Sequence, residues 1–280
     1  MTLLSAVHDT AFMPWLEPAQ IPVNRADTAL QYFSHFFQAA LARSAAQQRD
    51  IFRLRHKVYC EEMAFEPCRA NKLEHDSFDP RSLHACIKYC DKDTLAGTVR
   101  LITSENKDEL LPIEQYFGHC ITNPVLTPHN FDRRHICEIS RLAVPVEIRC
   151  KQSVMSNDRM TGLNTRESQC RSAVAVSLYL LAMLMSLQSK RHHVFVMIEP
   201  ALARVLKRIG IHFQQIGDVI HFNGKRAPYY IDARTTYDTL QHDYVELGKV
   251  LAQQLFNEKA AAAQTTDSAV AAELCFSAAS

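Results

Sequence analysis

The spacing of hydrophobic residues in the first half of the chain predicts two helices, a hairpin and a further strand. Apolar residues recur at near-helical intervals over residues 27–46 and over about 48–62. Residues 83–90 and 95–103 have the pattern of two strands joined by a short polar turn, which predicts an antiparallel hairpin. After a loop-rich stretch, residues 136–144 predict a strong strand that a proline ends.

The second half of the chain predicts helices and strands in alternation. After a polar, basic and exposed segment over residues 146–167, it predicts a helix over 168–189, a strand over 193–198, a helix over 200–209, strands near 211–217, 219–222 and 229–231, and a helix over 236–256. From about residue 258 the chain is rich in alanine and has no pattern, so we expect disorder there.

This order of elements predicts an α/β fold with a mixed central sheet flanked by helices. We expect residues 1–47 to be an N-terminal extension that carries a helix, residues 48–257 to be the main domain, and residues 258–280 to be a disordered tail.

One segment raises the question of a membrane span. Residues 172–188 contain no charged side chain, and their length is at the lower limit of about 17–25 residues for a spanning helix. Several serines interrupt the apolar run, and a strand-like segment follows almost at once. We therefore expect a helix buried against the sheet and no transmembrane span.

Charge and cysteine content limit the binding partners and the cellular compartment that we expect. The 280-residue chain has a net charge of +1, so no overall field favours nucleic acid or an anionic membrane. Its nine cysteines are an odd number and are scattered along the chain. The first residues lack the basic start and apolar run of a secretory signal. We expect a cytoplasmic protein without a disulfide framework.

Charged residues form three clusters, and a further arginine lies inside a predicted strand. They are Arg55; Glu74, Asp76 and Asp79; Glu138 and Arg141, with Ser140 between them; and Arg100 in the strand. Taken singly, the acidic trio fits a solvated loop or a weak calcium site without the glycine and distal glutamate of an EF-hand loop. Arg100 alone fits the end of a strand in solvent, and Glu138 with Arg141 fits a structural ion pair. Arg55 shares a helical face with apolar residues, so we expect it to be partly buried beside a partner.

Cys86, Cys90 and His84 lie on one face of a predicted strand, which suggests a zinc site. Zinc sites of this spacing need a second pair of ligands, and the sequence offers no convincing one. We therefore interpret these residues as half-buried strand residues and expect no bound metal.

Together, the charged clusters resemble a known enzyme group. Five phrases support the resemblance in order: residues 52–62 (FRLRHKVYCEE), 73–79 (LEHDSFD), 96–101 (AGTVRL), 138–144 (EISRLAV) and 224–231 (GKRAPYYI). They resemble the acyl-homoserine lactone synthases and, more closely, the N-acyl amino acid synthases and the exosortase/PEP-CTERM system-associated acyltransferases. These enzymes are relatives of the GCN5-related N-acetyltransferase (GNAT) superfamily.

The resemblance implies a GNAT-like fold and an N-acyltransferase that moves a fatty acyl group from a carrier-protein or coenzyme A thioester to the amine of an amino acid or similar small acceptor. It implies no tightly bound cofactor. It also implies substrate-binding roles for six residues: Arg55, Glu74, Asp76, Asp79, Arg100 and Phe117. It implies catalytic roles for three more: Glu138, Ser140 and Arg141.

Two departures from the family pattern shape this expectation. Phe65 is the only aromatic residue where homoserine lactone synthases often have tryptophan, and no glycine-rich phosphate loop follows the central strand. Acyl carrier protein is therefore a more plausible donor than acetyl-CoA. Two alternatives stay open: a homoserine lactone synthase that uses S-adenosylmethionine, and a non-catalytic module that binds acyl groups or a carrier protein.

Acyl transfer to an amine requires a proton acceptor and stabilisation of an oxyanion. We expect Glu138 to take the amine proton, with Ser140 on the same strand face. Arg141 should point to the opposite face unless a bulge redirects it. Arg55 and Arg100 should pair with Glu74, Asp76 and Asp79, or one arginine should instead bind the acceptor carboxylate.

The sequence predicts the residues that bind the acyl donor less specifically than those that bind the acceptor. The uncharged helix together with Phe195, Met197 and Phe213 either lines an acyl tunnel or simply fills the core. A set of basic residues either forms a docking surface for an acidic carrier protein or an ordinary solvated face: Arg149, Lys151, Arg159, Arg166, Arg171, Lys190, Arg191, Lys207 and Arg208.

Overall fold

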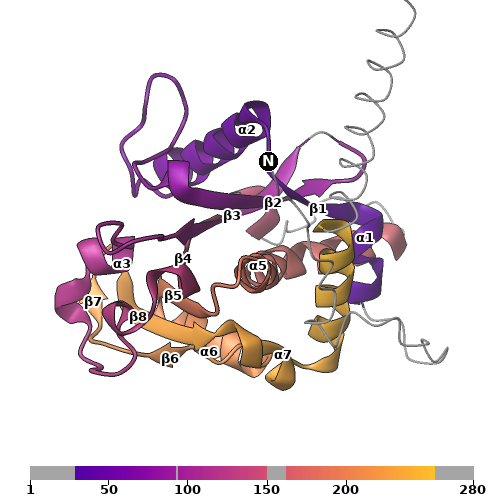
Figure 1. The fold of residues 1–280 in the computed structure, drawn as a ribbon. Coiled ribbons are helices and arrows are strands. Elements are labelled where there is room, and N and C mark those ends of the chain that lie inside the picture. The colour runs from indigo at the N-terminus through magenta and orange to yellow at the C-terminus, as the bar shows by residue number, and fades with distance from the viewer. Residues whose placement is uncertain (1–28, 93, 150–161, 256–280) are drawn as a thin grey trace, which may run out of the picture.

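The computed structural model describes residues 29–92, 94–149 and 162–255, and its centre is one mixed sheet (Figure 1). The strands are β1 (Phe37–Leu41), β2 (Ser82–Tyr89), β3 (Leu95–Thr103), β4 (Ile136–Ala143), β5 (His193–Ile198), β6 (Gln214–Gln215), β7 (Ile220–His221) and β8 (Lys225–Asp232). Their order across the sheet is β1-β2-β3-β4-β5-β8-β6, with β7 also paired to β8. Only β4 and β5 are parallel; the other pairs are antiparallel.

The helices are α1 (Phe33–Phe36), α2 (Ala45–His56), α3 (Pro112–Gln115), α4 (Val146–Arg149), α5 (Gly162–Gln188), α6 (Pro200–Arg208) and α7 (Thr236–Thr239), followed by a helix whose described part covers residues 242–255. Ser44 and Gln47 form a capping box that satisfies the first N–H groups of α2. At its other end α2 continues as a π-helical turn over Lys57–Glu62.

Helices α2 and α5 cover opposite faces of the strands β2 to β4 (Figure 1). Helix α5 packs on the face that carries Leu101 and Ile139, and its side chains from Leu178 to Leu184 are almost fully buried. The uncharged segment is therefore core, as predicted. Among the described residues, no helix has the length and apolar character that a membrane crossing requires.

Strands β4 and β5 separate at their carboxyl ends. Their pairing begins at Ile136 with His193 and ends at Ile139 with Val196, although both strands continue. Beyond Ile139, the edge of β4 that faces β5 has no strand partner. This opening between two parallel strands positions the candidate site described below.

Most predicted elements are confirmed, but the predicted helix over 27–46 is wrong in its second half. Residues 29–36 are helical, whereas Phe37–Leu41 form β1 at the edge of the sheet. Phe37 and Ala39 are buried while Gln38 is exposed, so the apolar residues that fit a helical period also fit the two-residue period of a strand. Pairing with β2 decides between the two.

Several other helices and strands also begin or end at residues other than those predicted. Helix α5 begins at Gly162 instead of residue 168, and the expected short strand at 229–231 is the eight-residue β8. The expected strands near 211–217 and 219–222 shrink to two residues each. The predicted helix over 236–256 is interrupted at Leu240, which takes an extended conformation and is buried. The expected tail beyond 258 lies outside the described residues.

The two ends of the described chain meet at the free edge of β1. In Figure 1 the last described helix lies beside α1. The Gln254 side chain accepts a hydrogen bond from the Ala39 N–H at 2.8 Å and donates one to the Phe37 carbonyl at 3.4 Å. The helix thereby covers polar groups of an edge strand that are otherwise open to pairing.

Close packing of α5 on β3 makes Gly97 sensitive to substitution. A Cβ atom at Gly97 would lie 2.9 Å from Leu178 Cδ1 and 3.2 Å from Val174 Cγ1, and both neighbours are fully buried. Gly97→Ala is expected to lower the free energy of unfolding by about 1–3 kcal/mol, measured by chemical denaturation. Gly118→Ala, where a Cβ meets nothing within 4 Å, is the control. Equal stability of the two variants would contradict this packing.

Candidate active site

A cluster of buried arginines and carboxylates lies under the predicted site. Arg55 Nε lies 2.5 Å from Glu74 Oε2, and Arg55 Nη1 lies 2.6 Å from Asp79 Oδ1. Arg100 Nη1 lies 2.9 Å from the same Asp79 oxygen and 2.6 Å from Asp76 Oδ1. The pairing of the two arginines with the acidic trio is therefore as expected, and Arg55 is fully buried, not just partly.

This pairing argues against two of the alternatives considered for these residues. Burial would raise the pKa of Asp79, but ion pairs and hydrogen bonds with Arg55, together with Arg100, hold that pKa well below its usual range. The three carboxylates are engaged by arginines, which disfavours the calcium interpretation. All three guanidinium nitrogens of Arg55 bind Glu74 and Asp79. Arg100 is already paired with two carboxylates through Nη1, so neither arginine is a favoured binder of an acceptor carboxylate.

Arg141 joins this cluster because β4 contains a bulge. Thr98 pairs with Ala143 and Arg100 pairs with Ser140, so two residues of β4 lie opposite one of β3. Arg141 has a φ of +47°. The exception named in the prediction therefore applies: a bulge redirects Arg141, which lines the same cavity as Ser140.

The redirected Arg141 side chain contacts three carboxylates. Arg141 Nη2 lies 2.9 Å from Glu66 Oε1 and 3.4 Å from Asp76 Oδ2, and Nε lies 3.2 Å from Glu74 Oε1. Its guanidinium carbon also lies 5.4 Å from the centre of the Tyr59 ring, whose hydroxyl donates to the Leu142 carbonyl at 2.8 Å. Arg141 thus braces the acidic loop against the bulge instead of pointing into open space.

Glu138 is buried without a cationic partner within ion-pair distance among the described residues. Burial raises the pKa of Glu138 to about 8. The Ile113 N–H donates to its Oε2 at 2.8 Å and opposes that rise, as do the positive charges of Arg100 and Arg81, whereas the charge of Glu114 adds to it. A carboxyl group with this pKa exchanges protons near neutral pH.

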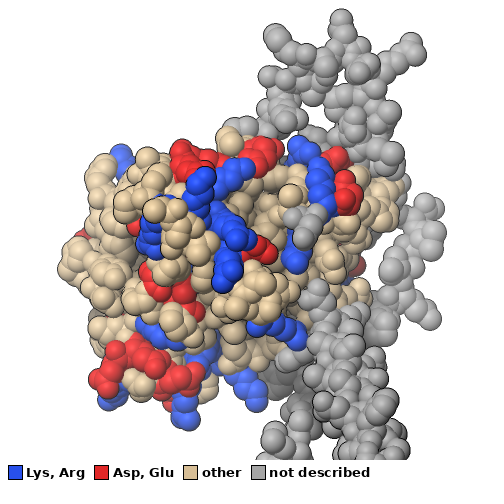
Figure 2. Space-filling model, turned by 90° about the horizontal axis from the view of Figure 1, so that it is seen from above, with Lys and Arg blue, Asp and Glu red and all other residues tan. Residues whose placement is uncertain are grey.

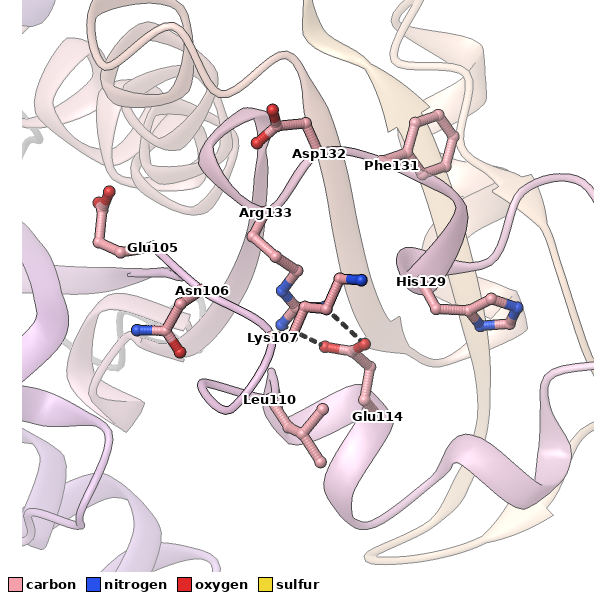
Figure 3. Close-up of a pocket in the computed structure, with 9 residues that line it drawn as sticks. All are labelled: Glu105, Asn106, Lys107, Leu110, Glu114, His129, Phe131, Asp132 and Arg133. Atoms are coloured by element: carbon pink, nitrogen blue, oxygen red, sulfur yellow. Dashed lines mark hydrogen bonds and ion pairs between the residues drawn. The ribbon is translucent and has the colours of Figure 1, made fainter.

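The N–H group that binds Glu138 belongs to α3, a single helical turn that an ion pair with Arg133 holds in place. Arg133 is buried and pairs with both oxygens of Glu114, at 2.7 and 2.8 Å (Figure 3). Glu114 Oε2 also accepts from the Leu111 N–H at 2.8 Å, which caps the turn. Arg133 and Glu114 line a second cavity of about 600 Å³ that contains none of the predicted site residues.

A cavity of about 760 Å³ lies where β4 and β5 separate. Six of the nine predicted site residues line it: Asp76, Arg100, Phe117, Glu138, Ser140 and Arg141. The other three, Arg55, Glu74 and Asp79, are buried behind its wall and hold the lining arginines. The sequence pattern had not singled out several further lining residues: Tyr59, Glu66, Arg69, Tyr116, Phe222 and Arg226.

Aromatic residues form the other side of this cavity. Phe117 and Phe222 meet edge to face with ring centres 5.0 Å apart, and Tyr116 packs on Phe78 at 6.0 Å. Of the residues expected to form an acyl tunnel, only Met197 lines the cavity. Phe195 and Phe213 pack in the hydrophobic core, as does α5. The cavity therefore has a charged half and an aromatic half.

Ser140 lies between Glu138 and the charged cluster. The Arg100 Nε donates to Ser140 Oγ at 3.0 Å. Because that oxygen already accepts from a cation, the Ser140 hydroxyl hydrogen is available to donate to a ligand in the cavity.

The expected basic docking surface is only partly basic in the structure. Arg191 is buried and donates to backbone carbonyls, while Arg149 and Arg171 pair with Glu62 and Glu167. Lys190, Lys207 and Arg208 are exposed. Lys151 and Arg159, and the side chain of Arg166, lie outside the described residues. On the face seen in Figure 2, blue and red side chains lie next to one another.

The cysteines do not gather with other ligands. Cys86 is buried and Cys90 is exposed, and neither forms a disulfide with a described residue. Within the described residues, no three histidine, cysteine, aspartate or glutamate side chains come together in a way that would hold a metal ion.

Comparison with known proteins agrees with this geometry. Residues 54–157 match the family described as the acetyltransferase (GNAT) domain. No curated protein sequence matches the chain. This sequence match includes all nine predicted site residues, from Arg55 to Arg141.

Solved structures share the fold at low sequence identity. The coenzyme A-dependent acyl-homoserine lactone synthase BjaI, with SAM and isopentyl-CoA, has a TM-score of 0.54 and 17% identity over 75% of this chain and 90% of its own. FeeM, an N-acyl amino acid synthase from uncultured soil microbes, has a TM-score of 0.51 and 15% identity over 73% and 94%. TofI, in a complex with an inhibitor and MTA, has a TM-score of 0.51 and 16% identity over 70% and 91%.

At these identities the structural likeness shows the fold, and the sequence match shows the domain. The predicted GNAT-like mixed sheet with flanking helices is confirmed. Residues 54–157 therefore match an acetyltransferase (GNAT) domain, and the chain has a GNAT-like fold.

Proposed function

We propose that this enzyme transfers a fatty acyl group from a carrier-protein or coenzyme A thioester to the amine of an amino acid or a similar small acceptor. The observation that carries the proposal is Glu138. It is a buried carboxyl with a pKa of about 8, and it lines the same cavity as Ser140 and the aromatic wall. Direct transfer without a covalent enzyme intermediate needs a base of this kind.

Glu138 moves one proton during the reaction. As the amine nitrogen bonds to the thioester carbon, the Glu138 carboxylate takes a proton from that nitrogen. When the carbon–sulfur bond breaks, the carboxyl returns the proton to the departing thiolate. The products are an amide and a free thiol, so atoms and charge balance.

Ser140 and the open edge of β4 act on the other atoms of the thioester. The Ser140 hydroxyl hydrogen is free to donate to the developing oxyanion or to the sulfur, because Arg100 occupies the oxygen. Beyond Ile139, β4 faces an opening where β5 no longer pairs. An extended thioester arm placed in this opening takes the position that a neighbouring strand would fill.

The aromatic half of the cavity supports an apolar acyl chain. Phe117, Phe222 and Met197 give it an apolar surface close to Glu138. We place the reaction in the cytoplasm with acyl carrier protein as the donor's carrier. The phrase at residues 224–231, within β8 and its turn, supports a link to exosortase-associated acyltransferases.

One observation favours a second candidate. BjaI is described as a coenzyme A-dependent acyl-homoserine lactone synthase and was solved with SAM and isopentyl-CoA. A chain with the same fold could use S-adenosylmethionine as the acceptor, and its product would be a lactone instead of an acyclic amide. A non-catalytic module would bind acylated carrier protein without turnover.

Glu138→Gln tests the role of the base. The variant keeps the size of the side chain and loses the proton acceptor, so we expect the acyl transfer rate to fall by about 10²–10⁴-fold. The measurement is mass spectrometry of N-acyl amino acids in lipid extracts of expressing cells, followed by kinetics with purified enzyme. Glu246→Gln, on the surface beside Lys249, is the control and should be fully active.

The pH profile gives the same test in the wild type. The base is active when ionised, so kcat/KM, corrected for ionisation of the acceptor amine, should rise with pH and level off above about 8. Normal activity of Glu138→Gln, or a profile that is flat between pH 6 and 9, would contradict the proposal.

Arg133→Lys tests the support of Glu138 from α3. Lysine cannot bind both oxygens of Glu114, so α3 loosens and the Ile113 N–H holds the Glu138 carboxylate less well. The midpoint of the pH profile should therefore move to higher pH. Arg134→Lys is the matched control, because the adjacent Arg134 is exposed and pairs only with Asp132. A lower rate with an unmoved midpoint would show that Arg133 is merely structural.

A further inference from the structure

The large cavity contains positive charge that no carboxylate among the described residues balances. Of its acidic lining residues, Glu66 pairs with Arg141, and Asp76 pairs with both Arg100 and Arg141. Glu138 is the remaining acid, and its raised pKa keeps it largely neutral at pH 7. Any further arginine in the lining therefore faces the cavity without compensation.

Arg226 is such a residue. It extends from β8 into the cavity lining, and within the described residues no carboxylate oxygen lies within 4.0 Å of it. Its Nε donates to the Phe222 carbonyl at 3.1 Å, and its Nη1 lies 3.5 Å from the Met197 carbonyl. Its guanidinium carbon lies 6.0 Å from the centre of the Phe65 ring.

These contacts fix the guanidinium through Nε and Nη1 and leave Nη2 unused. Nη2 has no hydrogen-bond partner among the described residues. An arginine fixed in this way is preorganised to donate from Nη2 to a planar or tetrahedral oxyanion. Little side-chain entropy is then lost when the ligand binds.

Arg69 strengthens the positive field at the same cavity. It also lines the cavity without a carboxylate partner among the described residues, and its Nη1 donates to the His75 carbonyl at 2.7 Å. Arg100 and Arg141, by contrast, are bound by acidic side chains on several sides. The acceptor-binding role considered for a clustered arginine therefore fits Arg226 better.

We infer that Arg226 binds an anionic oxygen group of a substrate in the cavity. This inference rests on the proposed function for the identity of the substrates. Two sources share the chemistry: the carboxylate of an amino acid acceptor, and the phosphate of the phosphopantetheine arm of the donor. Both place a singly or doubly charged oxyanion on a molecule that must enter this cavity for acyl transfer.

Binding measurements with Arg226→Gln test the inference without turnover. The probes are N-lauroylglycine, which carries the product carboxylate, N-lauroylglycinamide, which lacks it, and coenzyme A, which carries the phosphates. Isothermal titration calorimetry compares the wild type, Arg226→Gln, Arg226→Lys and the control Arg204→Gln on the exposed face of α6. Thermal melting of each variant checks that it is folded.

If the acceptor carboxylate is the ligand, Arg226→Gln should weaken binding of N-lauroylglycine by about tenfold or more and leave the glycinamide unchanged. If the donor phosphate is the ligand, the loss should appear with coenzyme A instead. Arg226→Lys keeps the charge but lacks the fork, so it should fall between. Arg204→Gln should bind every probe like the wild type.

The inference is overturned if Arg226→Gln binds N-lauroylglycine and coenzyme A as the wild type does, or if the folded wild type binds neither. Its failure is separate from failure of the proposed function. An enzyme that shows the Arg226-dependent difference in binding, yet never transfers an acyl group, would leave the anion site standing and remove the acyltransferase proposal.

Discussion

The sharing of Asp79 between Arg55 and Arg100 is the interaction on which the site depends. Both arginines are buried, and each contacts the same carboxylate oxygen, at 2.6 and 2.9 Å. Removing such charges from water costs several kcal/mol per ion, so the cluster is weak evidence for stability. Its effect is geometric: it joins α2, the acidic loop and β3 at one point, and removing one partner would leave a buried charge unpaired.

From this point the reactive geometry extends along β4. Arg100 binds Ser140 through Nε while the rest of its guanidinium holds the acidic loop. The bulge turns Arg141 toward the same loop, and among the described residues no cation lies within ion-pair distance of Glu138. Glu138 is then controlled mainly by burial and by the N–H group of Ile113. The ion-paired arginines and carboxylates thus lie beside Glu138, a carboxyl group that burial keeps largely neutral at pH 7.

Much of this was predictable from the sequence, because charge within an apolar pattern is informative. Arg55 lies on the buried face of a helix, which requires an acidic partner, and the nearby acidic trio supplies one. The strands and α5 were visible because period and length agree. The strand β1 was missed because residues 37–41 fit both periods, and only pairing with β2 decides.

Other features were not predictable from local pattern. The direction of Arg141 depends on register against β3, which a single strand does not encode. Arg133, Glu66 and Arg226 act through partners far along the chain, so no spacing identifies them. The choice between core and acyl tunnel for Phe195 and Phe213 stayed open, because a buried aromatic residue has the same sequence signature in both; the structure places them in the core.

The central claim is that burial makes Glu138 a base suited to neutral pH, and it is tested directly by carbon-13 NMR titration of the glutamate side-chain carboxyl groups in the folded enzyme. Comparison with Glu138→Gln assigns the signal. We predict one carboxyl, absent from the variant, that titrates with a pKa of about 8. If the assigned Glu138 signal instead titrates near 4.5, the usual value for glutamate, it would be fully ionised at neutral pH, and this account of the site would be wrong.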